Sequence, residues 1–327
     1  MTDGQQATDP TATSRSTDIE PLSVDDAADL TARIVENVER VIVGQHDAIE
    51  DILVVALARG HLLLEDVPGV GKTMLARAIA ASVDCSFKRV QFTPDLLPAD
   101  VTGVNVFDQR SQEFEFQPGP VFANVVLADE INRAPPKTQA ALLEAMEERQ
   151  VTVDGDTRAL PDPFVVIATQ NDVEAGQTYE LPMAEVDRFN KKLRLGYPDE
   201  AAETELLGRV TGDHPIESLE PVADTEVLRR ARRTVAEVDV REPVRNYVAR
   251  LAAHTREHAE LGVSPRGAIA VIQAAQARAV LDGRSFVTPD DVQGELQSVW
   301  AHRVRPGDRT STGADVVEAA RSATPVE

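Results

Sequence analysis

The fold of this chain is decided by one stretch, His61-Leu62-Leu63-Leu64-Glu65-Asp66-Val67-Pro68-Gly69-Val70-Gly71-Lys72-Thr73. It reads as an apolar strand, a loop rich in glycine and proline, and the start of an alanine-rich helix. This order builds a phosphate site, because the loop turns backbone N–H groups inward and the helix N-terminus adds the positive end of its dipole. We expect Lys72 to reach the β- and γ-phosphates of a nucleoside triphosphate, and the Thr73 hydroxyl to bind Mg²⁺.

One position departs from the usual phosphate-loop pattern G-x-x-x-x-G-K-[ST], because Asp66 stands where the first glycine is expected. Gly69 and Gly71 are present where the backbone must approach phosphate most closely. The loop is therefore still expected to bind phosphate, through the residues Asp66, Val67, Pro68, Gly69, Val70, Gly71, Lys72, Thr73 and Met74.

A second apolar run, Val125–Ala128, ends in the two carboxylates Asp129 and Glu130. Beside a phosphate loop, Asp129 would hold Mg²⁺, directly or through water, and Glu130 would polarise the water that attacks the γ-phosphate. A strand that ends in two acids is more often an ordinary solvated strand end. The phosphate loop lies earlier in the chain with one strand between, and this is what favours the catalytic interpretation.

The composition indicates a reduced, cytoplasmic protein of two domains. The chain has 327 residues, of which 42% are hydrophobic but only 4% aromatic, so the core must be aliphatic. A single cysteine, Cys85, excludes a disulfide framework. The sequence contains no apolar run long enough for a transmembrane helix and begins without a signal-peptide pattern, so we expect no membrane insertion and a cytoplasmic location.

The charge of the chain is strongly negative. The formal net charge is −22, and only five of the 33 basic residues are lysine. This balance lacks the basic footprint of a nucleic-acid-binding protein, so no nucleic-acid partner is expected. Acid-rich, lysine-poor surfaces are typical of proteins that work in molar salt, where charge repulsion is screened. An acidic face for a protein partner is the alternative interpretation.

The pattern of apolar residues predicts an α/β domain followed by a helical domain. The apolar runs are nearly continuous, which favours a parallel sheet covered by helices on both faces. The five expected strands are Leu62–Leu64, Phe87–Phe92, Val125–Ala128, Phe164–Thr169 and Lys191–Leu195. Two hairpins are expected as insertions, one over residues 104–116 and one around the turn Asp154-Gly155.

The expected domain boundaries follow from the same pass along the chain. Residues 1–22 are polar and acidic and should be a disordered tail. The α/β nucleotide-binding domain spans 23–198 and begins with helices after Ser23 and from His46 to Arg59. Only helical patterns follow Asp199, so 199–305 should form a helical lid, with a loose tail over 306–327.

The residues from Asp129 to Glu148 read DEINRAPPKTQAALLEAMEE, which resembles the signature of MoxR-type AAA+ ATPases. The stretches Gln91–Asp100 and Gln117–Pro120 are similar to other parts of that family, and so is Asp66 before the phosphate loop. The resemblance covers roughly residues 35–305. It implies a P-loop AAA+ core with a five-stranded parallel sheet, two β-hairpin insertions and an all-helical lid.

The resemblance also implies roles for single residues. Asn171 matches a first sensor, which would place its amide between the attacking water and the γ-phosphate; a strand-end asparagine satisfying a turn is the alternative. Arg188 matches the arginine that one subunit supplies to the ATP of its neighbour; the alternative is that Arg188 forms a local salt bridge. Arg266, at a helix start, matches a second sensor that faces the γ-phosphate across the interdomain cleft. Arg133 could act in the site or across a subunit interface.

The resemblance finally implies cofactors, partners and function. Gly44 and Gln45 would lie on the adenine side of bound ATP, with Mg²⁺ as the metal. The expected activity is ATP hydrolysis in a homo-oligomeric ring of six subunits. It would be coupled to remodelling of protein partners or insertion of metal cofactors, with von Willebrand A-domain proteins as clients. The alternatives are the motor of a nucleic-acid helicase or of a magnesium-chelatase-like complex.

Overall fold

A computed structural model of the protein describes residues 19–65, 69–170, 179, 181–198, 200–209 and 215–326. At its centre lies a five-stranded sheet with the strand order β2-β5-β8-β1-β9, in which all neighbouring strands are parallel. These strands are β1 (Leu62–Glu65), β2 (Phe87–Gln91), β5 (Val125–Asp129), β8 (Val165–Gln170) and β9 (Lys191–Leu193). The predicted α/β class and the five predicted strands are confirmed.

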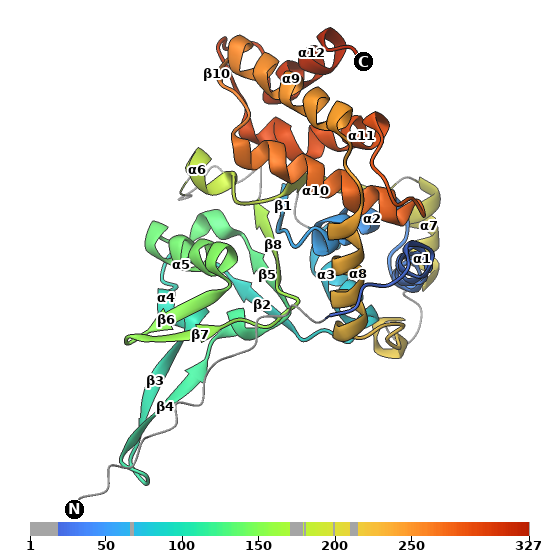
Figure 1. The fold of residues 1–327 in the computed structure, drawn as a ribbon. Coiled ribbons are helices and arrows are strands. Elements are labelled where there is room, and N and C mark those ends of the chain that lie inside the picture. The colour runs from blue at the N-terminus through green and yellow to red at the C-terminus, as the bar shows by residue number, and fades with distance from the viewer. Residues whose placement is uncertain are drawn as a thin grey trace, which may run out of the picture.

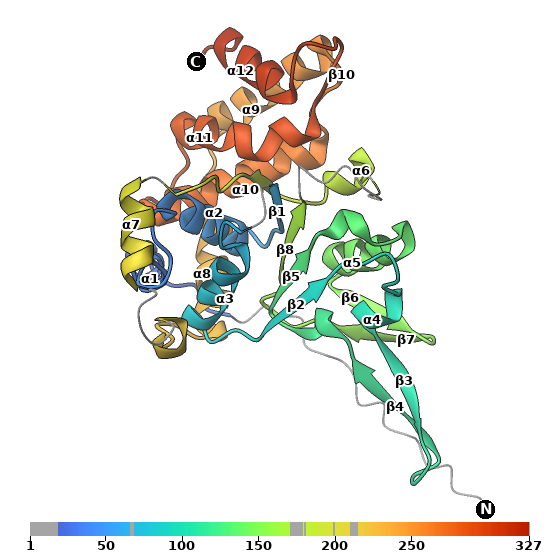
Figure 2. The ribbon, with the colours of Figure 1, turned by 180° about the vertical axis from the view of Figure 1, so that it is seen from behind.

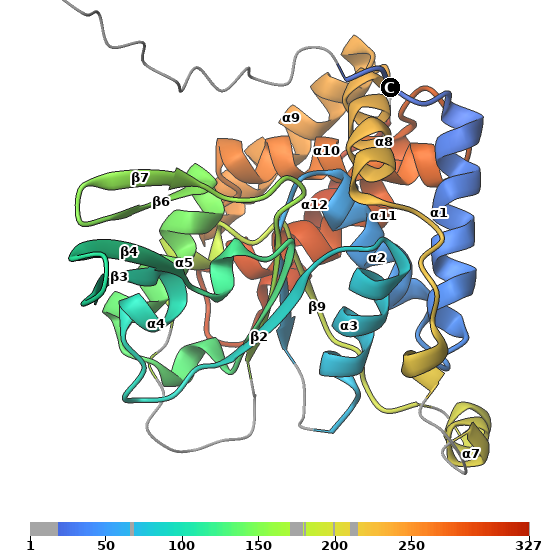
Figure 3. The same cartoon turned by 90° about the horizontal axis from the view of Figure 1, so that it is seen from below.

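Successive strand residues pack on opposite faces of the sheet, which explains why the strands read as continuous apolar runs. Leu62 and Leu64 face α1 (Val24–Glu39), α2 (His46–Leu57) and α3 (Lys72–Ser82), whereas Leu63 joins the cluster under α5 (Pro136–Glu148). Figure 3 shows these two helical layers on either side of the sheet.

The parallel arrangement gives the sheet two chemically different edges. All carboxyl ends lie at one edge, where Gln91 pairs in register with Asp129 and Glu65 with Gln170. All amino ends lie at the other edge, where the chain enters β1 at His61 and β9 at Asn190. Ligands of open α/β sheets bind at the carboxyl edge. The phosphate loop follows β1 at that edge.

Both predicted hairpins are present. The first is formed by β3 (Gly103–Asp108) and β4 (Glu113–Pro118), after the short helix α4 (Pro98–Thr102), and the second by β6 (Gln150–Val153) and β7 (Asp156–Ala159). The β3–β4 hairpin extends away from the rest of the molecule (Figure 1, Figure 2). The turn of the second hairpin has positive φ at Asp154 and Gly155, as a two-residue turn between twisted strands requires.

Helices dominate the chain from residue 200 onward. They are α7 (Glu200–Arg209), α8 (Thr225–Glu237), α9 (Glu242–His258), α10 (Pro265–Leu281) and α11 (Pro289–Trp300), and Figure 1 shows α9–α11 beside one end of the sheet. Ser264 and Thr288 cap α10 and α11 as the sequence indicates, each accepting a bond from a backbone N–H of the first turn. Within the described residues, no helix is long and apolar enough to cross a membrane.

The helical part and the α/β part share one continuous core, which joins α1–α3 to α8–α11 and to a last helix, α12 (Gly313–Ala323). A buried ion cluster joins them as well. Lys191 at the start of β9 is paired with Asp51 of α2 and with Glu295 of α11, and Arg278 of α10 binds both of these carboxylates. Charges buried this deeply are tolerated only when they are paired, so the cluster fixes how α10 and α11 sit against the sheet.

The expected loose tail over 306–327 is corrected by the structure. Residues Gly313–Ala323 form a further helix, α12, which packs against α9 and α11 and buries Val316, Val317 and Ala320. Thr312 and Asp315 form a capping box that satisfies the first N–H groups of the helix. Of the expected disordered tail over 1–22, only residues 19–22 are described. They lie against α8, whose Arg230 and Thr234 donate to the carbonyl oxygens of Glu20 and Leu22.

Candidate functional site

The described part of the phosphate loop has the geometry that a phosphate group requires. Gly69 and Gly71 both have φ of +91°, and the space in front of their α-carbons is open. Gly71 forms the N-cap of α3 and, as a glycine, has no side chain of its own to cap the first turn. The N–H groups of this turn are therefore presented to the loop, which suits an anion. Asp66, Val67 and Pro68 lie outside the described residues.

The first turn of α3 carries the two residues expected to bind nucleotide and metal. Lys72 is the first residue of the helix and is 8% exposed, while Thr73 and Met74 are half-buried. A cation at a helix N-terminus opposes the helix dipole, so a phosphate bound in the loop would offset an otherwise unfavourable placement. The residues present fit a nucleoside triphosphate with Mg²⁺.

Asp129 and Glu130 end β5 at the same edge of the sheet and are held by one hydroxyl. Thr169 Oγ1 donates to Asp129 Oδ1 at 2.6 Å and accepts from the backbone N–H of Glu130 at 2.8 Å. Glu130 adopts a left-handed conformation with φ of +55°. A glutamate in this region costs free energy and persists only when the surroundings enforce it. The hydroxyl of Thr169 supplies part of that constraint.

Both carboxylates are already engaged by side chains, and two of these, Arg89 and Gln91, were not singled out by the sequence. Arg89 Nη2 donates to Asp129 Oδ2 at 2.6 Å, and Gln91 Nε2 donates to Glu130 Oε2 at 2.7 Å. Arg133 Nη1 donates to the same Glu130 oxygen at 2.8 Å, which places Arg133 in the site of its own chain. The available signal for Arg89 and Gln91 was their place at the end of β2, which is paired with β5.

The segment expected on the adenine side lies at this edge too. Gly44 and Gln45 line a cavity of about 420 Å³ together with Leu193, the last residue of β9, and Leu195, two residues further on. Gln45 Nε2 donates to the Leu195 carbonyl at 3.3 Å. Leu193 belongs to β9, which pairs with β1, the strand that leads into the phosphate loop. Asn171, the expected first sensor, lies outside the described residues.

Arg188 and Arg266 are together, but at the other edge of the sheet. They line a cavity of about 390 Å³ with His61 and Asn190, the residues that precede β1 and β9. The expectation that Arg266 faces the γ-phosphate across the interdomain cleft is therefore wrong for a single chain. The cause is the packing of α10, which sets its N-terminus at the amino edge, while the phosphate loop lies at the carboxyl edge.

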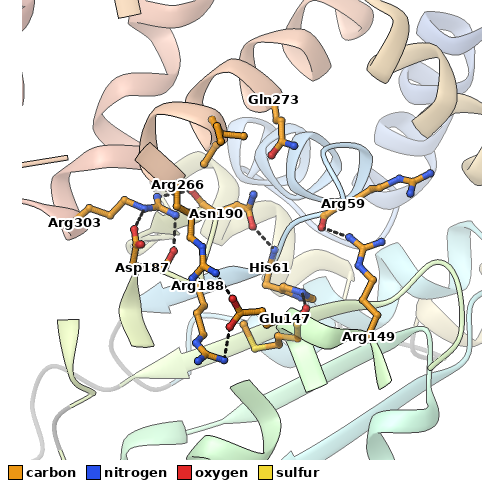
Figure 4. Close-up of a pocket in the computed structure, with 13 residues that line it drawn as sticks. Arg59, His61, Glu147, Arg149, Asp187, Arg188, Asn190, Arg266, Gln273 and Arg303 are labelled. Atoms are coloured by element: carbon orange, nitrogen blue, oxygen red, sulfur yellow. Dashed lines mark hydrogen bonds and ion pairs between the residues drawn. The ribbon is translucent and has the colours of Figure 1, made fainter. Parts of the chain in front are cut away.

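Figure 4 shows Glu147, near the end of α5, between these two arginines. Arg188 Nη1 lies 2.9 Å from Glu147 Oε2 and also donates to the Leu143 carbonyl at 2.8 Å. Arg266 pairs with the other oxygen, Glu147 Oε1. The side chains of Arg188 and Arg266 are 29% and 46% exposed, so both guanidinium groups reach solvent at this surface.

The segment that carries Arg188 is held by a residue of the helical part. Arg303, which is buried, donates to the Asp187 carboxylate and to the carbonyl oxygens of Asp187, Phe189 and Asn190. Ser264 Oγ donates to the same carboxylate at 3.2 Å, one residue before Pro265 and two before Arg266. Asp187 therefore links the backbone next to Arg188 with the helix start next to Arg266.

His61 closes the floor of this cavity as a neutral residue. Its Nδ1 accepts from the backbone N–H of Val166 at 3.0 Å, and its Nε2 lies 3.1 Å from the Met146 carbonyl. Burial lowers the pKa of His61 to about 3. The side chain thus joins β1, β8 and the end of α5, and has no role as a charged group at neutral pH.

Comparisons with known proteins show what most of the chain is similar to. Residues 61–191 match the family described as "ATPase family associated with various cellular activities (AAA)", and residues 251–320 match the AAA lid domain. The chain is similar to YeaC of Bacillus subtilis, with 51% identity over 282 residues that span 86% of this chain and 88% of YeaC. It is also similar to the chaperone MoxR1 of Mycobacterium tuberculosis, with 41% identity over 83% of this chain and 74% of that protein.

Two further comparisons cover more than four fifths of the chain. The protein MoxR of Paracoccus denitrificans is 36% identical over 293 residues, which span 81% of this chain and 85% of that protein. A solved structure of a candidate ATPase from Cytophaga hutchinsonii superposes with a TM-score of 0.88 at 34% identity, and covers 93% of this chain and 97% of its own.

Proposed function

Because the chain belongs to the MoxR family of AAA+ ATPases, we propose that it hydrolyses ATP to ADP and phosphate at the carboxyl edge of its sheet. One observation carries this proposal. The glycine loop that joins β1 to the start of α3 and the pair Asp129–Glu130 at the end of β5 lie at the same edge of one sheet. Triphosphate binding and water activation need these groups in one place.

In this mechanism the N–H groups of the loop and Lys72 bind the phosphates, and Thr73 with Asp129 would hold Mg²⁺. Bound Mg²⁺ would neutralise charge on the β- and γ-phosphate oxygens. Glu130 accepts the proton of the attacking water. Gln91 and Arg133 both donate to Glu130 Oε2, which fixes the orientation of the carboxylate. Asn171 is proposed to position the same water.

We propose that the active form is a homo-oligomeric ring of six subunits. Arg188 and Arg266 lie at the sheet edge opposite to the phosphate loop of their own chain, and both are partly exposed. This position supports the proposal that they act on a nucleotide held by an adjacent subunit. A fixed guanidinium at the developing charge is worth roughly 10³–10⁵ in rate in other NTPases. Turnover is thereby coupled to assembly.

We propose that the work is done on a protein. The β3–β4 hairpin exposes apolar side chains, among them Phe107 and Phe114, whose rings form an edge-to-face pair with centroids 5.3 Å apart. The basic residue of the second hairpin, Arg158, lies over the Phe116 ring and pairs with Asp156. An exposed apolar pair suits a polypeptide, whereas phosphate contacts would need several cations. A relative with the printed name chaperone MoxR1 supports a client of this kind.

The finer assignments are proposals on the same basis. A von Willebrand A-domain protein is the proposed client, and insertion of a metal cofactor into a protein complex is one form that remodelling could take. The surplus of acidic residues, with a net charge of −22, supports work in the cytoplasm of a cell with molar salt. The experiments proposed below are therefore carried out in concentrated KCl.

The first experiment measures binding of ATP with Mg²⁺ by calorimetry, and phosphate release by the same protein. We expect Glu130→Gln to keep nucleotide binding but to lose turnover by at least about two orders of magnitude, as removal of a general base does. Glu144→Gln, an exposed position on α5 with the same change in charge, should leave both quantities unchanged. Full turnover by the Glu130→Gln variant would refute the assignment.

The second experiment tests whether the site is shared between subunits. The acceptor subunit carries Arg188→Ala and Arg266→Ala and keeps its phosphate loop. The donor subunit carries Lys72→Ala and keeps both arginines. Neither should hydrolyse ATP alone, but their mixture should, because only the mixed interface is complete. A mixture as inactive as its components, although both are folded and the wild type is active, would contradict action between subunits.

A third experiment addresses the client. The Glu130→Gln variant, saturated with ATP in concentrated KCl, should retain its partner on an affinity resin. Enrichment of a von Willebrand A-domain protein is the expected result. Its absence from the retained proteins would contradict the partner proposal and leave the ATPase proposal intact.

A further inference from the structure

The cavity at the amino edge is unusually positive for a chain with so many acids. It is lined by Arg59, Arg149, Arg188, Arg266 and Arg303, against the two carboxylates of Glu147 and Asp187. Asp187 is fully engaged by Arg303 and Ser264. Glu147 is thus the carboxylate of this cavity that faces Arg188 and Arg266, with one oxygen directed at each guanidinium (Figure 4).

The two arginines and Glu147 belong to different elements of the fold. The backbone around Arg188 and the start of α10 are held from behind by Arg303 and Asp187. Glu147 instead comes from the last turn of α5 and is 35% exposed. Its contacts with the arginines are partly solvated ion pairs, which are individually weak and can be exchanged.

A phosphate group matches this pair of guanidinium groups better than a carboxylate does. It carries more charge, and it offers three acceptor oxygens to the planar donor forks of two arginines. In an assembled ring, the group that these arginines are proposed to meet is the γ-phosphate of an adjacent subunit. Glu147 and that phosphate then require the same donors.

We propose that Glu147 is a placeholder anion, which pairs with Arg188 and Arg266 in a free subunit and is replaced by the γ-phosphate of the adjacent subunit on assembly. This inference rests on the proposed function and adds a regulatory residue to it. Glu147 competes with bound nucleotide, so it weakens association that depends on ATP. Removing its charge strengthens that association, provided that the arginines keep their orientation through Asp187 and Arg303.

The opposite role makes the opposite prediction. If Glu147 were needed to orient the two arginines for catalysis, its removal would lower the rate at a saturated interface. Two quantities distinguish the roles: the donor concentration at half-maximal rate and the plateau rate. Both are measured in the mixture of donor and acceptor subunits defined above.

The experiment titrates donor subunits onto a fixed amount of acceptor subunits, with saturating ATP and Mg²⁺ in concentrated KCl, and records phosphate release. We expect Glu147→Gln in the donor to lower the half-maximal donor concentration by about two- to tenfold without lowering the plateau, since weak ion pairs are removed. The same substitution placed in the acceptor, whose two arginines are absent, should have no effect.

Glu148→Gln in the donor is the matched control. Glu148 is the next residue of α5 and is exposed, and no ion pair to it is found among the described residues. Both substitutions remove one negative charge from the C-terminal end of α5, where such a charge opposes the helix dipole. They therefore change helix stability in the same direction, and only Glu147→Gln removes the contacts to the arginines.

Three results would overturn the inference. These are an unchanged or raised half-maximal concentration, a lower plateau, or an equal effect of Glu148→Gln. Circular dichroism and thermal unfolding verify the fold of each variant, and Glu147→Ala repeats the titration if Glu147→Gln does not fold. Absence of hydrolysis by the wild-type protein would instead refute the proposed function, so the two failures are distinguishable.

Discussion

Arg303 donates from Nε to the carboxylate of Asp187 at 2.7 Å, and this contact joins the helical part of the chain to the segment that carries Arg188. The other nitrogens of the guanidinium reach backbone carbonyls on both sides of Arg188. A residue that belongs to the helical part thus sets the conformation of a residue proposed to act on another subunit's nucleotide. Its influence on hydrolysis is through position and not through contact with ATP.

Replacing Arg303 by lysine should weaken the hydrogen bonds that hold the segment 187–190. Lysine keeps the charge but cannot supply the planar fork of donors, so the segment 187–190 loses several hydrogen bonds. We expect phosphate release at saturating ATP to fall by about tenfold or more, with nucleotide affinity unchanged, because the phosphate loop is at the other edge of the sheet. Arg305→Lys, an exposed arginine two residues on, is the matched control. Equal rates in both variants would contradict the positioning role.

Thr169 should be required for the orientation of Asp129 and Glu130. Thr169→Val keeps the shape of the side chain but removes the hydroxyl that bonds both residues. We expect the turnover number to fall by roughly 10- to 100-fold, because the left-handed backbone of Glu130 loses a constraint and the carboxylates lose their geometry. Thr169→Ser should recover most of the rate. If the serine variant were as slow as the valine variant, the hydroxyl would not be the cause.

His61 makes stability depend on pH. Its pKa is about 3 in the folded state and about 6.5 in the unfolded chain, so the unfolded state binds more protons between these values. The free energy of unfolding should therefore fall as the pH decreases below 6.5, by up to about 1.4 kcal/mol per pH unit from this residue.

The measurement is urea unfolding at constant KCl concentration across this pH range, for the wild type and for His61→Gln. Glutamine can both donate and accept but does not titrate, so its curve should be shallower by the His61 contribution. Other groups titrate in the same range and are common to both proteins. Parallel curves would show that the pKa of His61 is not lowered in the folded state.

The capping box of α12 should contribute measurable stability. Thr312→Ala removes the side chain that accepts from the Asp315 backbone N–H, and loss of such a cap costs about 1 kcal/mol. We expect a lower thermal unfolding midpoint, while Thr310→Ala, a neighbouring exposed threonine outside the helix, should have a smaller effect. Because α12 buries Val317 against the shared core, equal midpoints would imply that the helix is not part of the cooperative unit.

Much of the fold could be predicted from local sequence signals. The five strands were recognisable because both sheet faces are covered, so that each strand is an apolar run. The turn Asp154-Gly155 and the caps Ser23, Ser264 and Thr288 marked the ends of elements through local chemistry. The helix α12 was missed because its apolar face is small, although Thr312 and Asp315 carried a capping signal that could have been read.

The relative positions of the site residues were harder to predict. Lys72, Asp129 and Glu130 follow strands of one sheet, so their meeting at the carboxyl edge follows from the parallel topology. The location of Arg266 depends on how α10 packs against α2, α8 and α11, which no local pattern encodes. Glu147 reads in the sequence as an exposed position of a helix, and only the approach of two arginines from distant segments gives it a role.

The ion cluster of Lys191, Asp51, Glu295 and Arg278 has a consequence for movement. It fastens an edge strand to two helices of the C-terminal part, and the aliphatic core runs through the same junction. Among the described residues, this junction between the α/β part and the helical part leaves little provision for a hinge. Motion driven by the chemistry is therefore expected to occur as rigid rotation of one whole copy against the next, with the boundary between copies as the moving part.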